Sequence, residues 1–382
     1  AWDISSISPC GVEGHLERWL CREFGDSIGR ELAPVMKEYY RLCAIRRPEF
    51  MGWTQVELAD RKAYPRRRSH VMDTEFSFKE FGNEADRYLN AYRSIADKAE
   101  DIGHRVPEQL RDNYFAQIRY PVVCAANMAV KMLEAQRARS FASGQCDNTL
   151  WGRDSLMLGA CARSIDAYQN IRKLTSYYND SLAGGKWRHS MCMNPRDLAV
   201  FNPPVLPVGL TTEEVAAYLV PDNELQSAHD DYVAVNCCDY TSATFIPQPV
   251  SLLGHSQAAV PLPKGETLSF EMDLEHDGIV SLTTAVIPTQ PDDTGDIRIR
   301  VRIDDGEPQT VSFKESGRTD RWKENVMRNQ ARIMTSHPWT PGRHVVSVTA
   351  LDSHVILDQL LLDTKAHRGF YVIPASGTPL RR

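Results

Sequence analysis

The chain has 382 residues, enough for two or three domains, and 42% of them are hydrophobic, which excludes a globally disordered protein. Its formal net charge of −6 excludes the basic excess that a nucleic-acid-binding surface needs. No window of about 18 uninterrupted apolar residues occurs, so we predict neither a membrane-spanning segment nor a membrane partner.

The chain begins with Ala1, and its first 20 residues lack a basic start followed by an apolar run. This pattern indicates a processed or partial chain. The lack of a leader therefore does not place the protein in the cytoplasm.

From about residue 12 to 183 the apolar residues recur at helical spacing, which predicts a bundle of about five helices over residues 1–192. Pro121 is expected to kink the fourth helix rather than end it, because the apolar stripe continues on both sides of it. Gly184 and Gly185 are expected to end the fifth helix. The stripes lie at residues 16–24, 32–43, 79–101, 107–132 and 148–182.

A change of pattern follows the bundle. Five prolines predict an extended, proline-rich linker over residues 193–227. From about residue 228 apolar and polar residues alternate, as in strands with one buried face, which predicts a carbohydrate-binding-like C-terminal domain over 228–382. Strands are predicted at 232–238, 244–249, 268–274, 279–287, 297–303, 309–314, 344–350, 354–362 and 369–373.

The sequence thus predicts an α+β multidomain protein, in which an N-terminal all-α helical bundle is followed by an antiparallel β-sandwich of jelly-roll type. Nine cysteines are present, an odd number without a CxxC pair, and most fall in predicted helices. Free thiols are therefore favoured over a disulfide framework, and neither a metal nor another cofactor is expected.

Three segments resemble the C-terminal region of glycoside hydrolase family 115, the xylan α-1,2-glucuronidases. The chain opens with AWDISS and continues to ERWLCREFG, similar to the place where the family's barrel joins its helical domain. Residues 177–191 read YYNDSLAGGKWRHSM. The third segment, residues 322–363, reads WKENVMRNQARIMTSHPWTPGRHVVSVTALDSHVILDQLLLD and looks like the family's closing β-domain.

The resemblance implies a parent enzyme that removes 4-O-methylglucuronic acid side chains from glucuronoxylan by metal-independent hydrolysis. It implies three partners: a catalytic α/β barrel, glucuronoxylan or a related polysaccharide, and a second copy in a homodimer. The polysaccharide substrate favours an extracellular or periplasmic location. A barrel needs about 250 residues of alternating strand and helix. The first 227 residues are instead predicted to be helix after helix, so no catalytic residue is assigned.

Two local features are candidate substrate contacts. Lys186 and Trp187 follow the glycines that end the last predicted helix, where an ammonium group suits a uronate carboxylate and an indole suits a sugar face. The alternative is a helix cap with Trp187 packed between domains. Arg66 and Arg67 lie in an arginine run that could attract an acidic polysaccharide or be a solvated surface loop.

Three further groups have both a functional and a structural interpretation. An arginine face on one strand could bind uronates or pair with acids on neighbouring strands. Three aromatic residues could stack on sugars or fill the sandwich core, and the core is favoured for Trp322 because it opens a strand-like segment. An aspartate-rich turn could hold calcium or serve as a turn alone. The groups are Arg298, Arg300 and Arg302; Trp322, Trp339 and Tyr371; and Asp292, Asp293 and Asp296.

The function predicted first is therefore a non-catalytic C-terminal portion of a glucuronic-acid-removing glycoside hydrolase, which serves in domain docking, dimerisation and substrate-cleft shaping. An alternative is a stand-alone carbohydrate-binding protein that recognises xylan through its β-sandwich. A third hypothesis is an autonomous hydrolase with its site near Lys186 and Trp187.

Overall fold

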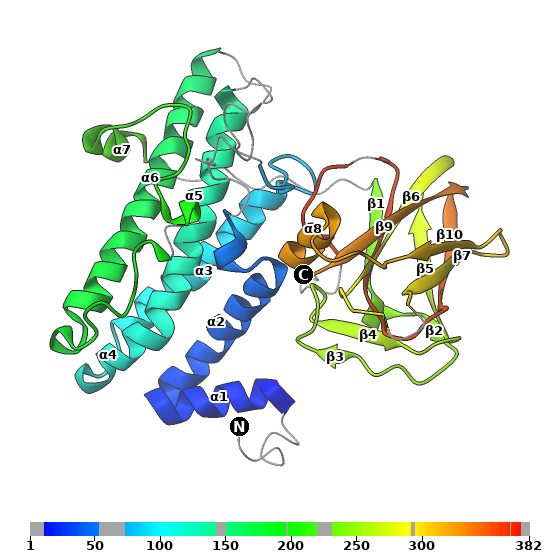
Figure 1. The fold of residues 1–382 in the computed structure, drawn as a ribbon, viewed down its shortest axis with the longest axis horizontal. Helices are drawn as coiled ribbons and strands as arrows, with labels where there is room; N and C mark the ends of the chain where they lie inside the picture. The colour runs from blue at the N-terminus through cyan, green and yellow to red at the C-terminus, as the bar shows by residue number, and fades with distance from the viewer. Residues whose placement is uncertain are drawn as a thin grey trace. The chain divides into compact units, whose positions relative to one another are not determined.

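The computed structural model describes residues 11–52, 73–142, 150–195, 198–219, 231–291, 295–366 and 368–375. Helices form the N-terminal part and antiparallel strands the C-terminal part, so the predicted fold class is confirmed (Figure 1). The chain divides into two compact units. The helical unit comprises Ala1–Leu42, Arg47–Phe78 and Ala85–Leu225, and the sandwich unit comprises Cys43–Arg46, Lys79–Glu84 and Gln226–Arg382.

Five long helices account for most of the helical structure in the described residues. The last two of them run antiparallel and lie side by side (Figure 1). No described helix is long and apolar enough to cross a membrane. The five are α1 (Gly11–Phe24), α2 (Asp26–Ile45), α3 (Glu84–Gly103), α5 (Tyr120–Ala142) and α6 (Leu150–Asp180).

The helix that contains Pro121 changes its geometry directly before the proline. The short helix α4 (Arg111–Tyr114), the π-helical turn η4 (Phe115–Arg119) and α5 follow one another without a break. Proline has no N–H to donate to the carbonyl one turn earlier, and its ring clashes with that carbonyl in a regular helix. The wider π-helical turn relieves both problems, so the helical path continues through Pro121 as predicted.

α5 is buried on most of its surface, and charged residues share that burial. Glu134 is fully buried and pairs with the guanidinium groups of Arg163 at 2.9 Å, Arg137 at 3.2 Å and Arg93 at 3.5 Å. Arg137 also pairs with Asp86. Opposite charges at such short range offset the cost of removing these groups from water.

Lys131, also on α5, is 1% exposed, and its ammonium group donates to the carbonyl oxygen of Val200 at 2.8 Å. The same ammonium lies 5.0 Å from the centroid of the Tyr168 ring. Burial lowers the pKa of Lys131 to about 7. In an unfolded chain a lysine titrates at about 10.4.

The free energy of unfolding is therefore expected to rise between about pH 7 and pH 10, because over this range the unfolded chain binds the proton that the folded chain has released. Lys131→Met should remove this part of the rise. Urea unfolding of both chains at pH 7 and pH 9.5 measures it, with the exposed Lys173→Met as control. An equal gain in the wild type and Lys131→Met would contradict the prediction.

Residues 198–219, in the proline-rich stretch after α6, pack on the bundle helices and are hydrogen-bonded to them. Besides the bond from Lys131 to Val200, Arg139 donates to the carbonyl oxygen of Val205 at 2.6 Å. The segment contains the 3₁₀ turn η7 (Ala199–Phe201) and the helix α7 (Thr212–Tyr218), which begins with a capping box. Its apolar side chains Leu206, Val208 and Leu210 pack against Ala138, Ala160 and Cys161.

Eleven strands form the sandwich in the part of the chain that the structure describes, and each pair of neighbours is antiparallel. In several of them buried and exposed residues alternate, as the sequence predicts. They are β1 (Tyr232–Asn236), β2 (Ser242–Ala243), β3 (Val250–Ser251), β4 (Ala258–Leu262), β5 (Thr267–Leu274), β6 (Gly278–Val286), β7 (Arg298–Ile303), β8 (Gln309–Ser312), β9 (Ala331–Trp339), β10 (Gly342–Ala350) and β11 (Val355–Asp363).

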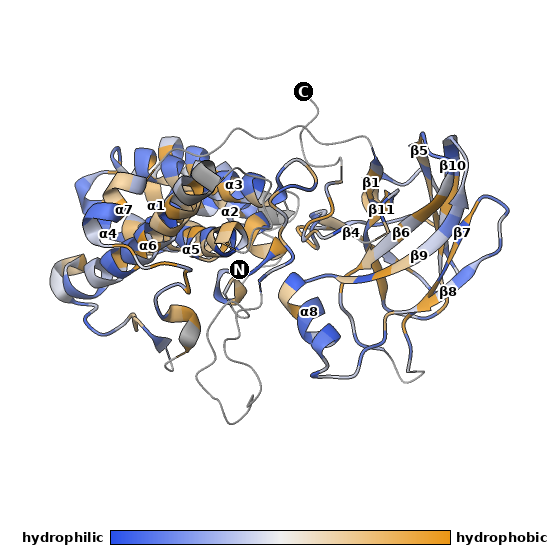
Figure 2. Ribbon diagram, turned by 90° about the horizontal axis from the view of Figure 1, so that it is seen from above, coloured by the Kyte–Doolittle hydropathy of each residue, from blue (hydrophilic) through white to orange (hydrophobic). Residues whose placement is uncertain are grey.

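The strands make two sheets that enclose one apolar core. The first has the order β3-β4-β11-β6-β9, with β1 also paired to β11, and the second has the order β2-β5-β10-β7-β8. Hydrophobic (orange) stretches occur on strands of both sheets (Figure 2). The core cluster takes residues from both, among them Phe270, Val301, Val348, Leu282 and Leu360. Two sheets that bury one shared apolar face are the architecture of a β-sandwich.

Two short segments from the N-terminal half of the sequence complete the sandwich unit. In one of them Phe81 is buried, and its ring packs edge-on against Tyr232 and Phe370, at 4.6 and 5.2 Å between centroids. Phe81, Gly82 and Asn83 have φ angles of 49°, 66° and 56°. Glycine and asparagine adopt this left-handed region readily, but a phenylalanine there is strained, so the aromatic packing must hold Phe81 in place.

Arg368 holds the same segment electrostatically. Its side chain is 1% exposed and pairs with Asp363 at 2.7 Å, Glu80 at 2.8 Å and Asp231 at 2.9 Å. The guanidinium carbon also lies 4.8 Å from the centroid of the Phe81 ring. The buried guanidinium group of Arg368 thus links Asp363 of β11 to Asp231, just before β1, and to Glu80 from the N-terminal half of the sequence.

Residues 320–339 differ from their sequence interpretation, in which Trp322 opens a strand-like segment and anchors the core. The structure places Trp322 on the helix α8 (Asp320–Arg328), followed by β9. The hydroxyl of Thr319 caps this helix by accepting the N–H of Trp322, and α8 is mostly hydrophilic (Figure 2). The strands expected at 244–249 and 369–373 do not form.

Candidate functional site

The terminal loop, residues 181–191, follows α6 and carries the Gly-Gly-Lys-Trp segment. Ala183, Gly184 and Gly185 have φ angles of 51°, 65° and 82°, and His189 has 64°. A side chain at Gly185 would place its Cβ 3.2 Å from the carbonyl oxygen of Asp180. Left-handed backbone at Ala183 and His189 is strained, and such strain persists only where surrounding contacts fix the conformation.

Hydrogen bonds fix the terminal loop at both ends. The Ala183 N–H donates to the carboxylate of Asp112 on α4 at 3.1 Å. The Asn179 side-chain amide donates to the carbonyl oxygen of Met191 at 2.8 Å and accepts the Met191 N–H at 2.9 Å. A loop restrained in this way loses little conformational freedom on binding a ligand.

Lys186 and Trp187 lie on the surface of this restrained loop. The Trp187 side chain is 40% exposed, and the Lys186 ammonium lies 5.0 Å from the centroid of its indole ring. The pair therefore presents an aromatic plane and a positive charge together, which suits the apolar face and the carboxylate of a uronic acid. That these two residues bind substrate stays a prediction.

Aromatic residues beside the loop were not identified from the sequence. Tyr177 on α6 is exposed, and its ring lies 4.6 Å from the ring of Phe115, which opens the π-helical turn η4. Tyr178 packs on Tyr120 at 5.0 Å. π-helical turns occur frequently at functional sites. The signal available in the sequence was the Tyr-Tyr pair in the family-like segment and the proline two residues beyond η4.

The remaining sequence candidates are mostly structural. Arg66 and Arg67 lie outside the described residues. Trp339 is buried and donates its indole N–H to the carbonyl oxygen of Leu274 at 3.0 Å, and Tyr371 is buried as well. The interpretation of Trp339 and Tyr371 as sugar-stacking platforms is therefore wrong, because neither ring can reach a ligand.

The arginine face of β7 is partly neutralised. Arg298 pairs with Asp352 through two hydrogen bonds of 2.7 and 3.0 Å and lies 3.7 Å from Asp296. Arg300 and Arg302 are exposed. Arg298 thus has an acidic partner, which lies between β10 and β11 rather than on a neighbouring strand.

The part of the chain that the structure describes contains no group of three or more His, Cys, Asp or Glu residues that could hold a metal ion. Asp292 and Asp293 lie outside the described residues, and Asp296 accepts a hydrogen bond from the Ser312 hydroxyl at 2.5 Å. The described cysteines are free, as predicted: Cys21, Cys43, Cys124, Cys161, Cys192, Cys237 and Cys238.

Buried carboxylates of both units are engaged in structural contacts. Glu134, Asp363 and Asp352 pair with arginines. Glu84 accepts the backbone N–H groups of Tyr371 and its neighbour Val372. These four buried carboxylates therefore help to fix the fold.

Residues 220–376 match the family described as the glycosyl hydrolase family 115 C-terminal domain. No curated protein matches the chain. Among solved structures, the family GH115 4-O-methyl-α-glucuronidase BtGH115A, with specificity for decorated arabinogalactans, is 31% identical. The match covers 95% of this chain and 43% of that protein, with a TM-score of 0.74, so the chain spans less than half of that relative.

Two carbohydrate-binding modules also match. One is CsCBM6-3 from Clostridium stercorarium, in complex with cellobiose (19% identity, 35% of this chain, 93% of that one, TM-score 0.27). The other is the family 35 module from Cellvibrio japonicus Abf62 (12%, 36%, 97%, 0.28). Likenesses this weak carry no argument. The matched domain and the likeness to BtGH115A show that this chain is the C-terminal region of a glycoside hydrolase family 115 protein.

Proposed function

We propose that the chain is the non-catalytic C-terminal portion of an enzyme that removes glucuronic acid or 4-O-methylglucuronic acid side chains from glucuronoxylan. The chemistry would take place in a catalytic α/β barrel. This chain would dock on that barrel, support dimerisation and supply the terminal loop as one wall of the substrate cleft.

The terminal loop supports this proposal. Its strained backbone is held by Asp112 and Asn179, and it presents Lys186 and Trp187 to solvent. Strained, restrained loops with exposed aromatic and charged side chains are a common feature of binding sites. In the proposal Trp187 stacks on the sugar ring and Lys186 pairs with the uronate.

The identity of the polysaccharide has two candidates. Glucuronoxylan follows from the resemblance to xylan glucuronidases. The relative BtGH115A is described as a 4-O-methyl-α-glucuronidase with specificity for decorated arabinogalactans. Both polymers belong in any assay, since the proposed contacts of Lys186 and Trp187 are to a side-chain uronate rather than to the backbone of the polymer.

The folded 382-residue chain alone is expected to release no 4-O-methylglucuronic acid from either polymer, because the proposal places the two carboxylates of glycoside hydrolysis in the separate barrel. Chromatography of the products against a blank measures this. Release above the blank would mean that bundle and sandwich residues build a site of their own.

In a protein that joins this chain to a catalytic barrel, Lys186→Ala and Trp187→Ala are each expected to lower kcat/KM about tenfold, the usual scale for losing one charge-assisted hydrogen bond or one stacking contact. Lys173→Ala, an exposed lysine on α6, is the matched control. Unchanged kcat/KM in both loop variants would exclude the loop from the cleft.

The stand-alone carbohydrate-binding alternative has less support. Two of the three aromatic residues nominated as platforms on the sandwich are buried, Trp339 and Tyr371. With these two rings buried, the sandwich has fewer of the nominated aromatic planes on which a neutral xylan chain could stack. Migration of the whole chain in a glucuronoxylan affinity gel tests this alternative. If it holds, the gel should retard the wild type and the Lys186→Ala and Trp187→Ala variants equally.

A further inference from the structure

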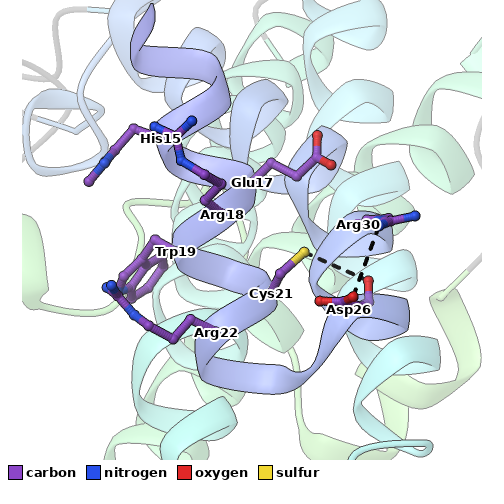
Figure 3. A pocket seen from close by; sticks show the side chains of 8 residues that line it. All are labelled: His15, Glu17, Arg18, Trp19, Cys21, Arg22, Asp26 and Arg30. Carbon is purple, nitrogen blue, oxygen red and sulfur yellow. Dashed lines mark hydrogen bonds and ion pairs between the residues drawn. The ribbon is translucent and has the colours of Figure 1, made fainter. Parts of the chain in front are cut away.

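A hollow of about 590 Å³ lies where α1 meets α2 at one end of the helical unit. α1 contributes His15, Arg18, Trp19 and Arg22, whose spacing of three and four residues places them on one face of the helix. Figure 3 shows His15, Trp19 and Arg22 on one side of α1, and Cys21, Asp26 and Arg30 on the side toward α2. The volume is in the range of small-ligand sites, about 300–1,000 Å³.

The helix that carries this face is firmly held. Its opposite side buries Leu20 and Phe24, and the Phe24 ring packs edge-on against Tyr114 on α4 at 5.7 Å. Gly29 on α2 has no side chain, and a Cβ there would lie 2.3 Å from the backbone nitrogen of Cys21. The two helices can approach this closely only because residue 29 is glycine. The hollow is therefore built on rigid backbone.

The lining of the hollow is basic although the whole chain is acidic. The lining contains three guanidinium groups, those of Arg18, Arg22 and Arg30, and two carboxylates, whereas the whole chain carries a net charge of −6. Of these, Arg30 lies 4.0 Å from Asp26. Arg22 is exposed and lies one helical turn from the half-buried indole of Trp19. An aromatic plane beside a guanidinium group matches a pyranose ring that bears a carboxylate.

The hollow and the terminal loop are linked through one short helix. Phe24 of α1 packs on Tyr114 of α4, and Asp112 of α4 accepts the N–H of Ala183 in the terminal loop. Figure 1 shows α1 and α4 toward the same end of the bundle. A polysaccharide with uronate side chains along its length could thus be held at more than one point of this end.

We propose that the hollow binds a uronic acid residue on the side of α1 that faces away from α2, with Trp19 stacked on the sugar ring and Arg22 paired with the carboxylate. The inference rests on the proposed function for its ligand class. It adds a second uronate contact, which would hold the polymer while the terminal loop lines the cleft.

The test uses the Lys186→Ala/Trp187→Ala form of the 382-residue chain, so that the terminal loop contributes nothing. Isothermal titration calorimetry with a xylotriose that carries one 4-O-methylglucuronic acid is expected to show saturable binding that weakens as salt is added. Arg22→Gln in this background should weaken binding about tenfold, and Trp19→Ala several-fold. Arg172→Gln, which removes an exposed arginine from α6, should leave the affinity unchanged.

Unsubstituted xylotriose separates the carboxylate from the backbone sugars and is expected to bind at least tenfold more weakly. Absence of binding, equal affinity for both oligosaccharides, or full affinity in Arg22→Gln with circular dichroism of the wild type would each overturn the inference. The proposed function is tested apart from this, by the activity of the loop variants joined to a barrel. If the hollow binds uronate but kcat/KM is unchanged in the loop variants, the proposed function is wrong and the binding site in the hollow is still supported.

Discussion

Replacing Arg368 with alanine is expected to lower the free energy of unfolding of the sandwich unit by about 3–5 kcal/mol, the range for removing one partner of a buried ion pair. Arg368 is 1% exposed and neutralises the carboxylates of Glu80, Asp231 and Asp363. Without it, three negative charges would face one another in a largely buried space. The packing of its guanidinium group on Phe81 would also be lost.

Lys365 provides a matched control for Arg368, because it pairs with two of the same carboxylates. Its ammonium lies 3.1 Å from Asp231 and 3.7 Å from Glu80, but its side chain is half exposed. Lys365→Ala should therefore change stability by less than about 1 kcal/mol. Hydrogen exchange at the buried amides of β11 reports the sandwich unit alone. Equal protection in both variants would mean that Arg368 is not the residue that joins these segments.

Glu134→Gln is expected to lower the free energy of unfolding of the helical unit by about 3–5 kcal/mol, because it removes the negative partner of buried guanidinium groups. The amide keeps the shape of the side chain, but the guanidinium groups of Arg93, Arg137 and Arg163 lose their shared carboxylate. Hydrogen exchange along α5 measures the loss. Glu31→Gln is the control, since Glu31 pairs with Arg105 at the surface, and it should have a much smaller effect. Comparable losses in both variants would contradict the prediction.

Glu134 also makes the stability of the helical unit depend on pH. Burial alone would raise the pKa of its carboxyl group, but the nearby guanidinium groups of Arg137 and Arg163 hold the pKa below its ordinary value. The stabilisation is therefore complete above the ordinary pKa of a glutamate and is lost as the pH falls through the lower value in the folded protein. Wild type and Glu134→Gln should converge in stability on acidification, and a constant difference would count against it.

Elements whose stability comes from their own sequence could be predicted. The helices of the bundle follow from apolar stripes, and β5 and β7 from strict alternation in Leu268–Leu274 and Ile297–Ile303. β9 was missed because it contains Pro338 at its end and exposes Met334, so its pattern is irregular. The helix α8 lies in the same segment and was not predicted, because Trp322 favoured a strand there.

Features that depend on distant residues could not be predicted. Gly82 and Asn83 favour a left-handed turn, but nothing in the local sequence signals that Phe81 joins it, because its partners Tyr232 and Phe370 lie in the sandwich. The candidate site divides in the same way. The sequence nominates Lys186 and Trp187, but the restraint of their loop comes from the distant Asp112, which no spacing rule identifies.

The position of Phe81 in the sandwich unit has a consequence for biosynthesis. The ribosome makes Phe81 long before Tyr232, Arg368 and Phe370, which cover and hold it. Until then the Phe81 ring lacks the side chains that cover it and is open to chaperones or to other chains. Contacts between residues so far apart in sequence also form slowly. The sandwich unit must therefore mature after its last strand is synthesised rather than strand by strand during translation.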